Sequence, residues 1–250
     1  MAGQGDPMAT QLSIVVPLRN EERNVEPLWS EIRSAVVRIP GNAEILLVDD
    51  HSSDQTGAIC ARLAGFAQGD PLIVRALRNT CQPGKDGALR TGLGACAGEV
   101  IVTLDGDLQN DPADIPLLLD SLDSCDIVCG IRKLRRDCMA RRVVSRIANV
   151  VRNFVTGDNI RDAGCALRAM KHWCTGPILK YDLRLCGCAH CFYPSLVRMH
   201  GGRVSQVEVG HRPRPTGGSK FALVRGRLGP GIRACIEVRR LKKLLDCRVA

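Results

Sequence analysis

Two aspartates with one glycine between them carry the clearest chemical signal in the sequence. Asp105 and Asp107 follow the mostly apolar run 100–104, which has the composition of a buried strand. A strand that ends there would direct both carboxylates toward one point. Carboxylate oxygens are hard ligands that suit Mg²⁺ or Mn²⁺, and a metal held in this way can also bind a diphosphate. The pair therefore predicts a divalent-metal site that binds a phosphorylated ligand.

Two further acidic clusters follow apolar runs in the same way. Glu21 and Glu22 come after the first run, and Asp49 and Asp50 end the second. The carboxyl ends of parallel strands lie along one edge of a sheet, where ligands bind. Acidic residues are common in loops, so any one cluster alone would mean little. Three clusters at equivalent strand ends predict one crevice, with a cation or hydrogen-bond donors between carboxylates that would otherwise repel each other.

The elements that must position these clusters alternate between strand and helix patterns. Five β-rich runs cover residues 12–17, 44–50, 72–77, 100–105 and 126–130. Val25, Leu28 and Ile32 recur at helical spacing after the first run, and Asp111-Pro112 provides an N-cap and a first-turn proline after the fourth. This alternation predicts an α/β, Rossmann-like fold, with a mostly parallel sheet and helices on both faces.

Length and composition fit one large domain. We expect a flexible N-terminus over residues 1–10, a globular domain over 11–224 and a basic amphipathic segment over 225–250. The formal charge of +9 indicates an anionic partner. Aromatic residues make up only 3% of the chain, which leaves few stacking platforms, and no nucleic-acid-binding signature is present. Nucleic acid is therefore not the expected partner.

The 13 cysteines are an odd number, and residues 1–10 lack the apolar core of a secretory signal. We therefore expect a reduced, cytosolic protein. Cys186, Cys188 and Cys191 surround His190 at a loosely zinc-like spacing, but no second ligand pair accompanies them. Small buried thiols are the favoured interpretation of the cysteines, with structural zinc as the alternative.

Positive charge is concentrated after residue 131, in the segments 132–136 and 141–142. An apolar helical stripe follows, formed by Val143, Val144, Ile147, Val150, Val151 and Phe154. Two interpretations are equally compatible with this pattern. The stripe would lie at an anionic membrane surface, or it would pack on the protein's own core. No apolar stretch approaches the roughly 20 residues that a membrane-spanning helix requires.

Several motifs together resemble family 2 glycosyltransferases. The first three cover residues 15–22, 48–56 and 104–109. The later motifs, over 145–149, 162–169, 211–214 and 218–221, are similar to the polyprenyl-phosphate branch of that family, which includes the dolichol-phosphate mannose synthases. The resemblance extends from about residue 12 to residue 221 and implies a GT-A fold.

The resemblance also implies roles for individual residues. The nucleotide site would comprise Pro17, Arg19, Glu21, Val48, Asp50, Asp105 and Gly106. Asp105, Asp107 and Gln109 would hold Mg²⁺ or Mn²⁺. Asp107, Arg132, Arg214 and Lys220 would form the catalytic set, in which the three cations hold the phosphates of donor and acceptor.

The implied reaction is an inverting transfer of a hexose, mannose or glucose, from a GDP- or UDP-linked sugar to a polyprenyl phosphate. Because a phosphate monoester is already ionised at neutral pH, it needs no strong general base. We expect the protein to lie peripherally on the cytoplasmic face of an anionic membrane, with a membrane-protein partner as a further expectation. The alternatives are a transferase acting on a polysaccharide or soluble acceptor, and a polyanion-binding protein without enzymatic activity.

Three residues depart from the pattern of the resembled branch. Arg19 replaces an aromatic residue, Cys191 follows His190 where arginine is frequent, and Phe221 replaces tyrosine. These departures predict an altered sugar preference or weakened activity.

Overall fold

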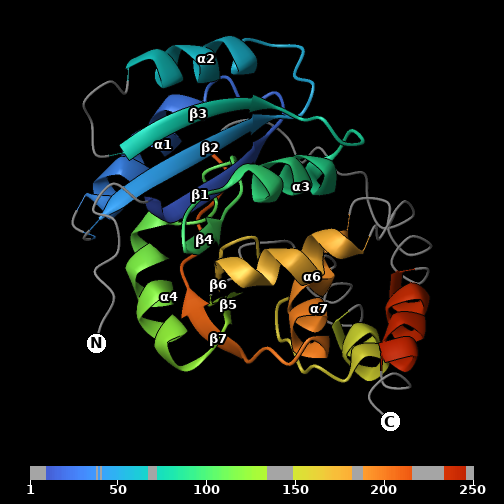
Figure 1. Ribbon diagram of the computed structural model, residues 1–250. Coiled ribbons are helices and arrows are strands. Elements are labelled where there is room, and N and C mark those ends of the chain that lie inside the picture. The colour runs from blue at the N-terminus through green and yellow to red at the C-terminus, as the bar shows by residue number, and fades with distance from the viewer. Residues whose placement is uncertain are drawn as a thin grey trace.

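One seven-stranded sheet forms the centre of the molecule (Figure 1). The computed structural model describes residues 10–37, 39, 41–66, 72–133, 149–181, 188–215 and 234–245. The strands are β1 (Thr10–Leu18), β2 (Asn42–Asp49), β3 (Leu72–Arg78), β4 (Val100–Thr103), β5 (Ile127–Arg132), β6 (Arg168–Lys171) and β7 (Val204–Val209). Their order in the sheet is β3-β2-β1-β4-β6-β5-β7. Strand β6 pairs antiparallel with both of its neighbours, and the other pairings are parallel. The predicted α/β class with a mostly parallel sheet is confirmed.

Helices cover both faces of the sheet. They are α1 (Val25–Val36), α2 (Thr56–Phe66), α3 (Lys85–Ala95), α4 (Ile115–Ser121), α6 (Thr175–Lys180) and α7 (Tyr193–Met199). Short 3₁₀ turns cover Pro112–Asp114, Leu122–Ser124, His172–Cys174 and Ala189–Phe192, the last of which is called η4 below. Residues 149–156 and 234–245 are also helical.

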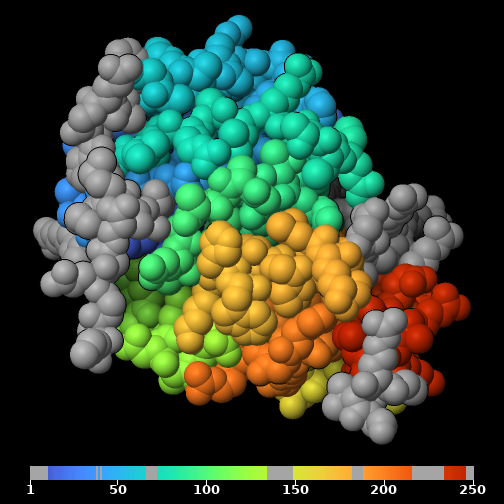
Figure 2. All heavy atoms as spheres, in the orientation of Figure 1, coloured from blue at the N-terminus to red at the C-terminus, as the bar shows by residue number. Residues whose placement is uncertain are grey.

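The alternation of side chains along β1 separates two hydrophobic layers. Ile14 and Val16 point to one face, where α1, α2 and α4 pack, as shown by Leu28 and Ile115 in the same cluster. Val15 points to the opposite face, which α3, α6 and α7 cover. Figure 2 shows the side chains of α3 and α6 lying against each other over this second face. Because every β1 residue from 12 to 16 is buried, the strand is apolar on both sides.

The structure contains two strands that the sequence patterns did not predict. Strand β6 is four residues long and includes Arg168, whose side chain is fully buried. It therefore lacks the apolar run by which buried strands are recognised. Strand β7 is an edge strand whose first five residues are partly or wholly exposed. All five predicted β-rich runs correspond to strands β1 to β5.

The apolar stripe of the basic region is visible in part, over residues 149–156. Val150, Val151 and Phe154 are 67%, 46% and 85% exposed, so these three side chains do not pack on the core. The opposite side of this helix, which carries Arg152, is buried. Residues 134–148 lie outside the described part of the chain. Among the described helices, none combines the length and apolar character needed to cross a membrane.

The described C-terminal helix packs against the main domain. Ala234, Cys235 and Val238 are buried in a small cluster with Ala189 and Phe192 of η4. Lys242 donates a hydrogen bond to the carbonyl of Thr156, and Figure 1 shows the helix beside residues 149–156. This helix therefore stabilises the region that follows β5.

Candidate active site

The three acidic clusters lie together at the carboxyl edge of β1, β2 and β4. The backbone N–H of Glu21 donates to Thr56 Oγ1 at 2.8 Å, which joins the loop after β1 to the loop after β2. The loop after β4 approaches β1 closely, because a Cβ on Gly106 would lie 2.4 Å from Leu18 Cδ2 and 3.2 Å from the Pro17 carbonyl oxygen. A side chain at position 106 would push the two loops apart. The predicted convergence of the clusters is confirmed.

The loop that carries Asp105 and Asp107 has a defined turn. Leu108 adopts a positive φ of 60°, which is uncommon for a residue with a bulky side chain. The backbone N–H of Asp105 donates to Asn110 Oδ1, and that of Gln109 donates to Asp107 Oδ1. These bonds hold the two carboxylates at the end of β4, with their backbone conformation fixed by the loop itself.

Asp105 and Asp107 differ in their electrostatic environment. Lys85 Nζ lies 2.5 Å from Asp105 Oδ1. Burial opposes ionisation of Asp105, but this ion pair outweighs it and holds the pKa of Asp105 below its usual range. Burial and the neighbouring charge of Asp105 raise the pKa of Asp107 to about 6, although Arg214 lies 3.7 Å away. A cation placed between the two carboxylates would relieve this repulsion.

The donor set fits a divalent ion that is completed by its substrate. Among the described residues, no group of three or more carboxylate, histidine or cysteine side chains could hold a metal on its own. Mg²⁺ is commonly bound through one or two carboxylates together with substrate phosphates. Asp105 and Asp107 supply that number of carboxylates. Gln109, the third predicted ligand, donates its side-chain amide to the Arg212 carbonyl at 3.4 Å, which leaves its amide oxygen as the available ligand atom.

Asp50, predicted to contact the nucleotide, also organises the site. Asn79 Nδ2 donates to Asp50 Oδ1 at 2.7 Å, and the Gly84 N–H lies 2.9 Å from both carboxylate oxygens. Gly84 has a φ of 121°, which favours glycine at the start of α3. Arg19, another predicted nucleotide-site residue, lies 3.5 Å from Asp50 Oδ2. Val48 is fully buried beneath this edge.

A segment after β7 crosses the carboxyl edge and contacts the loops that follow β1 and β4. The Arg212 N–H donates to the Gln109 carbonyl at 2.9 Å, and its guanidinium bonds Glu31 at 2.8 Å and Asp111 at 2.6 Å. Arg214 bonds Glu21 and also approaches Asp107. We refer to residues 210–215 as the strap. It places the predicted phosphate-binding Arg214 beside Asp107, one of the predicted metal ligands.

Arg132 is paired with a buried aspartate, Asp162. Its guanidinium donates two hydrogen bonds to Asp162, at 2.7 and 2.8 Å. Its charge nevertheless contributes to lowering the pKa of Asp105, which places it on the same side of the site. Lys220 and Phe221 lie outside the described residues, as does Cys186.

Two functional features were not found from the sequence. Lys85 pairs with Asp105, although the sequence analysis assigned no role to Lys85. Asp86, the next residue, accepts a 2.6 Å bond from His190, which is 104 residues away. The side chains of Lys85, Asp105, Arg168 and His190 lie around one narrow gap at this edge of the sheet. The Lys85–Asp105 and Asp86–His190 contacts cannot be predicted from neighbouring residues in the sequence, because each depends on how distant elements pack.

Known proteins share both the sequence motifs and the fold. The model of the glycosyl transferase family 2 matches residues 13–172. The chain is 35% identical over 229 residues to a dodecaprenyl-phosphate galacturonate synthase of Rhizobium johnstonii. It is 32% identical over 216 residues to an undecaprenyl-phosphate 4-deoxy-4-formamido-L-arabinose transferase of Salmonella choleraesuis. These alignments cover 89% and 86% of this chain but 65% and 64% of the relatives, so it spans less than two thirds of their length.

Solved structures confirm the expected GT-A fold. Glucosyl-3-phosphoglycerate synthase from Mycobacterium tuberculosis, in complex with UDP, superposes with a TM-score of 0.64 at 20% identity, over 90% of this chain and 80% of that one. The same enzyme with Mg²⁺ and UDP gives a TM-score of 0.58 at 21% identity, over 82% and 73% of the two chains. At this level of identity the likeness shows the fold alone.

Proposed function

The chain belongs to glycosyl transferase family 2, and from this premise we propose that it transfers a sugar from a nucleotide-sugar donor to a polyprenyl phosphate. The observation that carries the proposal is the arrangement of Asp105 and Asp107 between Lys85 and Arg214. Two carboxylates flanked by two cations can hold a metal and the diphosphate that it binds. Both relatives described above have a polyprenyl phosphate in their names.

The charges of the site suit a diphosphate leaving group. Mg²⁺ or Mn²⁺ held by Asp105, Asp107 and Gln109 would supply Lewis-acid neutralisation of the diphosphate. Arg214 and Lys85 lie where they would hold its oxygens, and Arg132 adds positive charge on the same side. Developing negative charge on the leaving group is then stabilised by groups that are already oriented.

The acceptor phosphate requires little activation. One of its oxygens would form a bond to the anomeric carbon while the bond from that carbon to the diphosphate breaks. In-line displacement of this kind inverts the anomeric centre. Because the acceptor oxygen is ionised at neutral pH, no proton has to be removed during the step. The site accordingly presents cations rather than a dedicated general base.

The sugar is the finer part of the proposal. Mannose or glucose remains our expectation for the hexose, and GDP and UDP are both candidates for the nucleotide. The names of the two relatives specify galacturonate and 4-deoxy-4-formamido-L-arabinose. A donor panel should therefore include UDP-galacturonic acid and UDP-4-deoxy-4-formamido-L-arabinose beside GDP-mannose and UDP-glucose.

The proposal is tested by incubating each donor with detergent-dispersed polyprenyl phosphate and detecting the glycolipid by mass spectrometry. We expect one donor to react, only with Mg²⁺ or Mn²⁺ present. Asp107→Asn should lower the rate by about a hundredfold or more, whereas Asp123→Asn, an exposed aspartate on a distant turn, should not. Transfer to a soluble or polysaccharide acceptor with none to the lipid would overturn the choice of acceptor. Absence of donor binding in thermal-shift measurements would overturn the enzyme proposal.

Peripheral attachment to the cytoplasmic face of the membrane is also proposed. Exposed Val150, Val151 and Phe154 form an apolar surface on one helix, and the preceding sequence is strongly basic. Apolar and basic groups together favour an anionic bilayer surface. Co-sedimentation with anionic but not neutral vesicles at low salt would support this part. Equal recovery in the supernatant with both vesicle types would contradict it.

A further inference from the structure

Two thiols lie on one tight turn that sugar transfer does not use. Cys188, Ala189, His190 and Cys191 form a Cys-x-x-Cys sequence that enters η4, immediately before α7. The Cys191 N–H donates to the Cys188 carbonyl at 3.0 Å, which closes the turn. Both cysteines are thiols, and both are half-buried. A Cys-x-x-Cys turn is a recurrent arrangement of redox-active dithiols.

His190 is oriented toward this turn by a buried carboxylate. Its Nδ1 lies 2.6 Å from Asp86 Oδ1, and the backbone N–H groups of Ala189 and His190 donate to the two oxygens of Asp86 at 2.8 and 3.1 Å. The charge of the His190 side chain also acts on the thiol of Cys191, its neighbour in the chain. An imidazole that is held by a carboxylate next to a thiol is the arrangement by which proteins activate a cysteine nucleophile.

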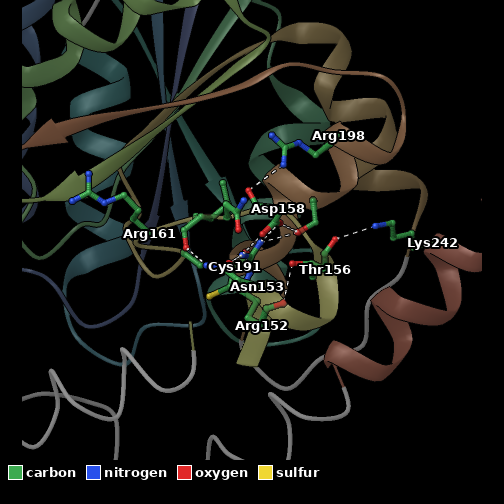
Figure 3. A network of polar contacts seen from close by, with 12 residues as sticks. Arg152, Asn153, Thr156, Asp158, Arg161, Cys191, Arg198 and Lys242 are labelled. Atoms are coloured by element: carbon green, nitrogen blue, oxygen red, sulfur yellow. Dashed lines mark hydrogen bonds and ion pairs between the residues drawn. The ribbon is translucent and has the colours of Figure 1, made fainter. Parts of the chain in front are cut away.

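Two buried arginines fix the backbone of the same turn. Arg168 donates to the His190 carbonyl, and Arg152 Nε donates to the Cys191 carbonyl at 3.0 Å (Figure 3). Arg168 is 1% exposed and its guanidinium bonds two backbone carbonyls. It forms no ion pair with a carboxylate, and its Nε has no hydrogen-bond partner, among the residues that the structure describes. Its positive charge is therefore left to act on the adjacent thiol.

The charge environment separates Cys191 from the other cysteines. Burial opposes its ionisation, but His190 and then Arg168 outweigh burial and lower the pKa of the Cys191 thiol to about 7. Burial also opposes protonation of His190, but the Cys191 thiolate and Asp86 raise the pKa of His190 to about 9. Burial raises the pKa of Cys60, Cys96, Cys125, Cys129, Cys165, Cys174 and Cys235.

The titratable and charged groups around Cys191 come from five elements. They are His190 on the same turn, Asp86 on α3, Arg168 on β6, Arg152 on the helix 149–156, and Cys235 on the C-terminal helix. Of these groups, Asp86 opposes the thiolate, and the thiolate in turn raises the pKa of Cys235. Asp86 is already paired with His190. The net field of the described groups therefore favours the ionised sulfur.

We propose that Cys191 is the nucleophilic thiol of a reversible redox site, with Cys188 as the resolving thiol, and that the site reacts with small disulfide oxidants. The geometry that carries this assignment is the Cys-x-x-Cys turn, which the Cys191 N–H closes and Asp86 anchors, with the His190 ring held by Asp86 next to Cys191. Redox-sensing cysteines elsewhere combine thiolate character, access to solvent and a nearby second thiol. Cys191 is a partly exposed residue with a second thiol three positions before it and with His190 and Arg168 lowering the pKa of its thiol.

The exchange proceeds in two balanced steps. The Cys191 thiolate attacks one sulfur of the external disulfide, forming a mixed disulfide and releasing one thiolate, which takes up the proton that Cys191 had lost. The Cys188 thiol then loses its proton and attacks the Cys191 sulfur, forming the Cys188–Cys191 disulfide and releasing the second thiol. The dithiol loses two electrons and the external disulfide gains them.

We expect the Cys188–Cys191 disulfide to affect the sugar-transfer site through helix α3. The Cys191 thiolate balances His190, His190 holds Asp86, and Asp86 adjoins Lys85, which pairs with the metal-site carboxylate of Asp105. A disulfide removes the thiolate charge and alters the turn that Asp86 anchors. We therefore expect the oxidised protein to transfer sugar more slowly, an effect that rests on the proposed function.

The reactivity of Cys191 is tested by alkylating the protein with limiting iodoacetamide at pH 6.5 and quantifying each cysteine by mass spectrometry. A thiol with a pKa near 7 should react about fivefold faster than an ordinary thiol at this pH, after allowing for its lower intrinsic nucleophilicity. Cys81 is the internal reference because it is exposed and lies outside the cluster. Faster labelling of Cys191 than of Cys81, lost in His190→Gln, is expected. Labelling no faster than that of Cys81 would overturn the proposal.

The resolving step is tested with oxidised glutathione on the full chain. Wild type should end as a Cys188–Cys191 disulfide, Cys188→Ser should stop at a glutathione adduct on Cys191, and Cys191→Ser should form neither. Cys186→Ser is the matched control, since it removes a thiol from the same segment but leaves Cys-x-x-Cys intact, and it should behave as wild type. A stable glutathione adduct in wild type, or failure of Cys186→Ser to close the disulfide, would overturn the role of Cys188.

Transfer activity is measured on the same samples. The transfer rate of oxidised wild type should be about tenfold or more below that of the reduced protein, as expected when a catalytic group is displaced. Dithiothreitol should restore the rate. The activity of Cys191→Ser, measured against the same variant before treatment, should not fall in oxidant. If the disulfide forms but reduced wild type transfers no sugar, the proposed function fails while the redox site stands. If transfer is active and unaffected by the disulfide, the regulatory consequence is wrong.

Discussion

Two aspartates, the buried Asp158 and the partly buried Asp107, have opposite electrostatic environments in two regions of the molecule. The Asp158 side chain is 1% exposed, Arg152 donates to both of its oxygens at 2.7 and 2.5 Å, and the Ser195 hydroxyl also donates to it. Figure 3 shows this network beside the helix 149–156. Asp107 lies next to another carboxylate, with Arg214 at 3.7 Å.

Burial opposes ionisation of both aspartates, yet the outcomes are opposite. Arg152 and Ser195 hold the pKa of Asp158 below its usual range, whereas the charge of Asp105 adds to burial and raises the pKa of Asp107 to about 6. A buried carboxylate that has its hydrogen bonds and its counter-charge in place stabilises the folded structure. A buried carboxylate held against a like charge marks the place where a ligand brings the missing cation.

Of the substitutions in the two regions, Asp158→Asn is expected to change the free energy of unfolding most. It removes the counter-charge of Arg152, whose side chain is 5% exposed, and leaves a buried guanidinium without its carboxylate. We expect the free energy of unfolding to fall by about 3 kcal/mol, measured by urea denaturation of the metal-free protein. Asp123→Asn removes an exposed aspartate and should change it by less than about 0.5 kcal/mol. Equal values for the two variants would show that the Asp158 network is not structural.

The ion pair between Arg152 and Asp158 predicts how the free energy of unfolding depends on pH. Because the pKa of Asp158 is lowered in the folded state, its stabilisation is present above the ordinary carboxyl pKa of about 3.9 and is lost as pH falls through the folded-state value. The difference in unfolding free energy between wild type and Asp158→Asn should therefore be constant above about pH 5 and shrink below pH 4. A difference that grows on acidification would contradict the assignment of Asp158 as an ionised partner.

Sequence patterns predicted the carboxyl edge of the sheet but not the region of Asp158. The edge is readable because each acidic cluster directly follows an apolar strand, so the fold class alone brings Glu21, Asp50 and Asp105 together. Arg152 falls within a basic, apolar helix pattern in which an arginine is expected on the solvent side. The helix instead turns Arg152 inward and exposes Val150 and Phe154.

Long-range pairing explains the other omissions. Lys85 and His190 reach the site only because α3 packs against η4 and the end of β4, which no local spacing encodes. Strand β6 carries the buried Arg168 instead of an apolar run. The predicted roles of Pro17, Arg19, Val48 and Arg132 toward a nucleotide or phosphate stay predictions, since they concern ligands rather than contacts within the chain.

Asp107→Asn is expected to change the free energy of unfolding less than Asp158→Asn, and in the opposite direction. In the metal-free protein this substitution removes the repulsion between Asp105 and Asp107 while keeping the shape of the side chain. We expect the free energy of unfolding to rise by about 1 kcal/mol or to stay unchanged, in contrast to Asp158→Asn. The measurement is urea denaturation with a chelator present. A loss as large as that of Asp158→Asn would remove the distinction between a framework carboxylate and a ligand-binding one.

The smallest effect concerns the strap, which joins the ligand-binding edge to α1. Arg212 bonds Glu31 and Asp111 near the surface, and such partly exposed pairs contribute at most about 1 kcal/mol. Arg212→Ala should loosen the strap, so that Arg214 contacts Asp107 and the donor less often, and raise the KM for the donor about threefold to fivefold with little change in kcat. Arg203→Ala, which removes a more exposed arginine paired at 3.8 Å, is the control and should alter neither constant. A fall in kcat comparable to that of Asp107→Asn would place Arg212 among the groups that contact the reacting atoms. An unchanged KM would show that the hydrogen bonds of Gln109 to the Arg212 backbone hold the strap without the Arg212 side chain.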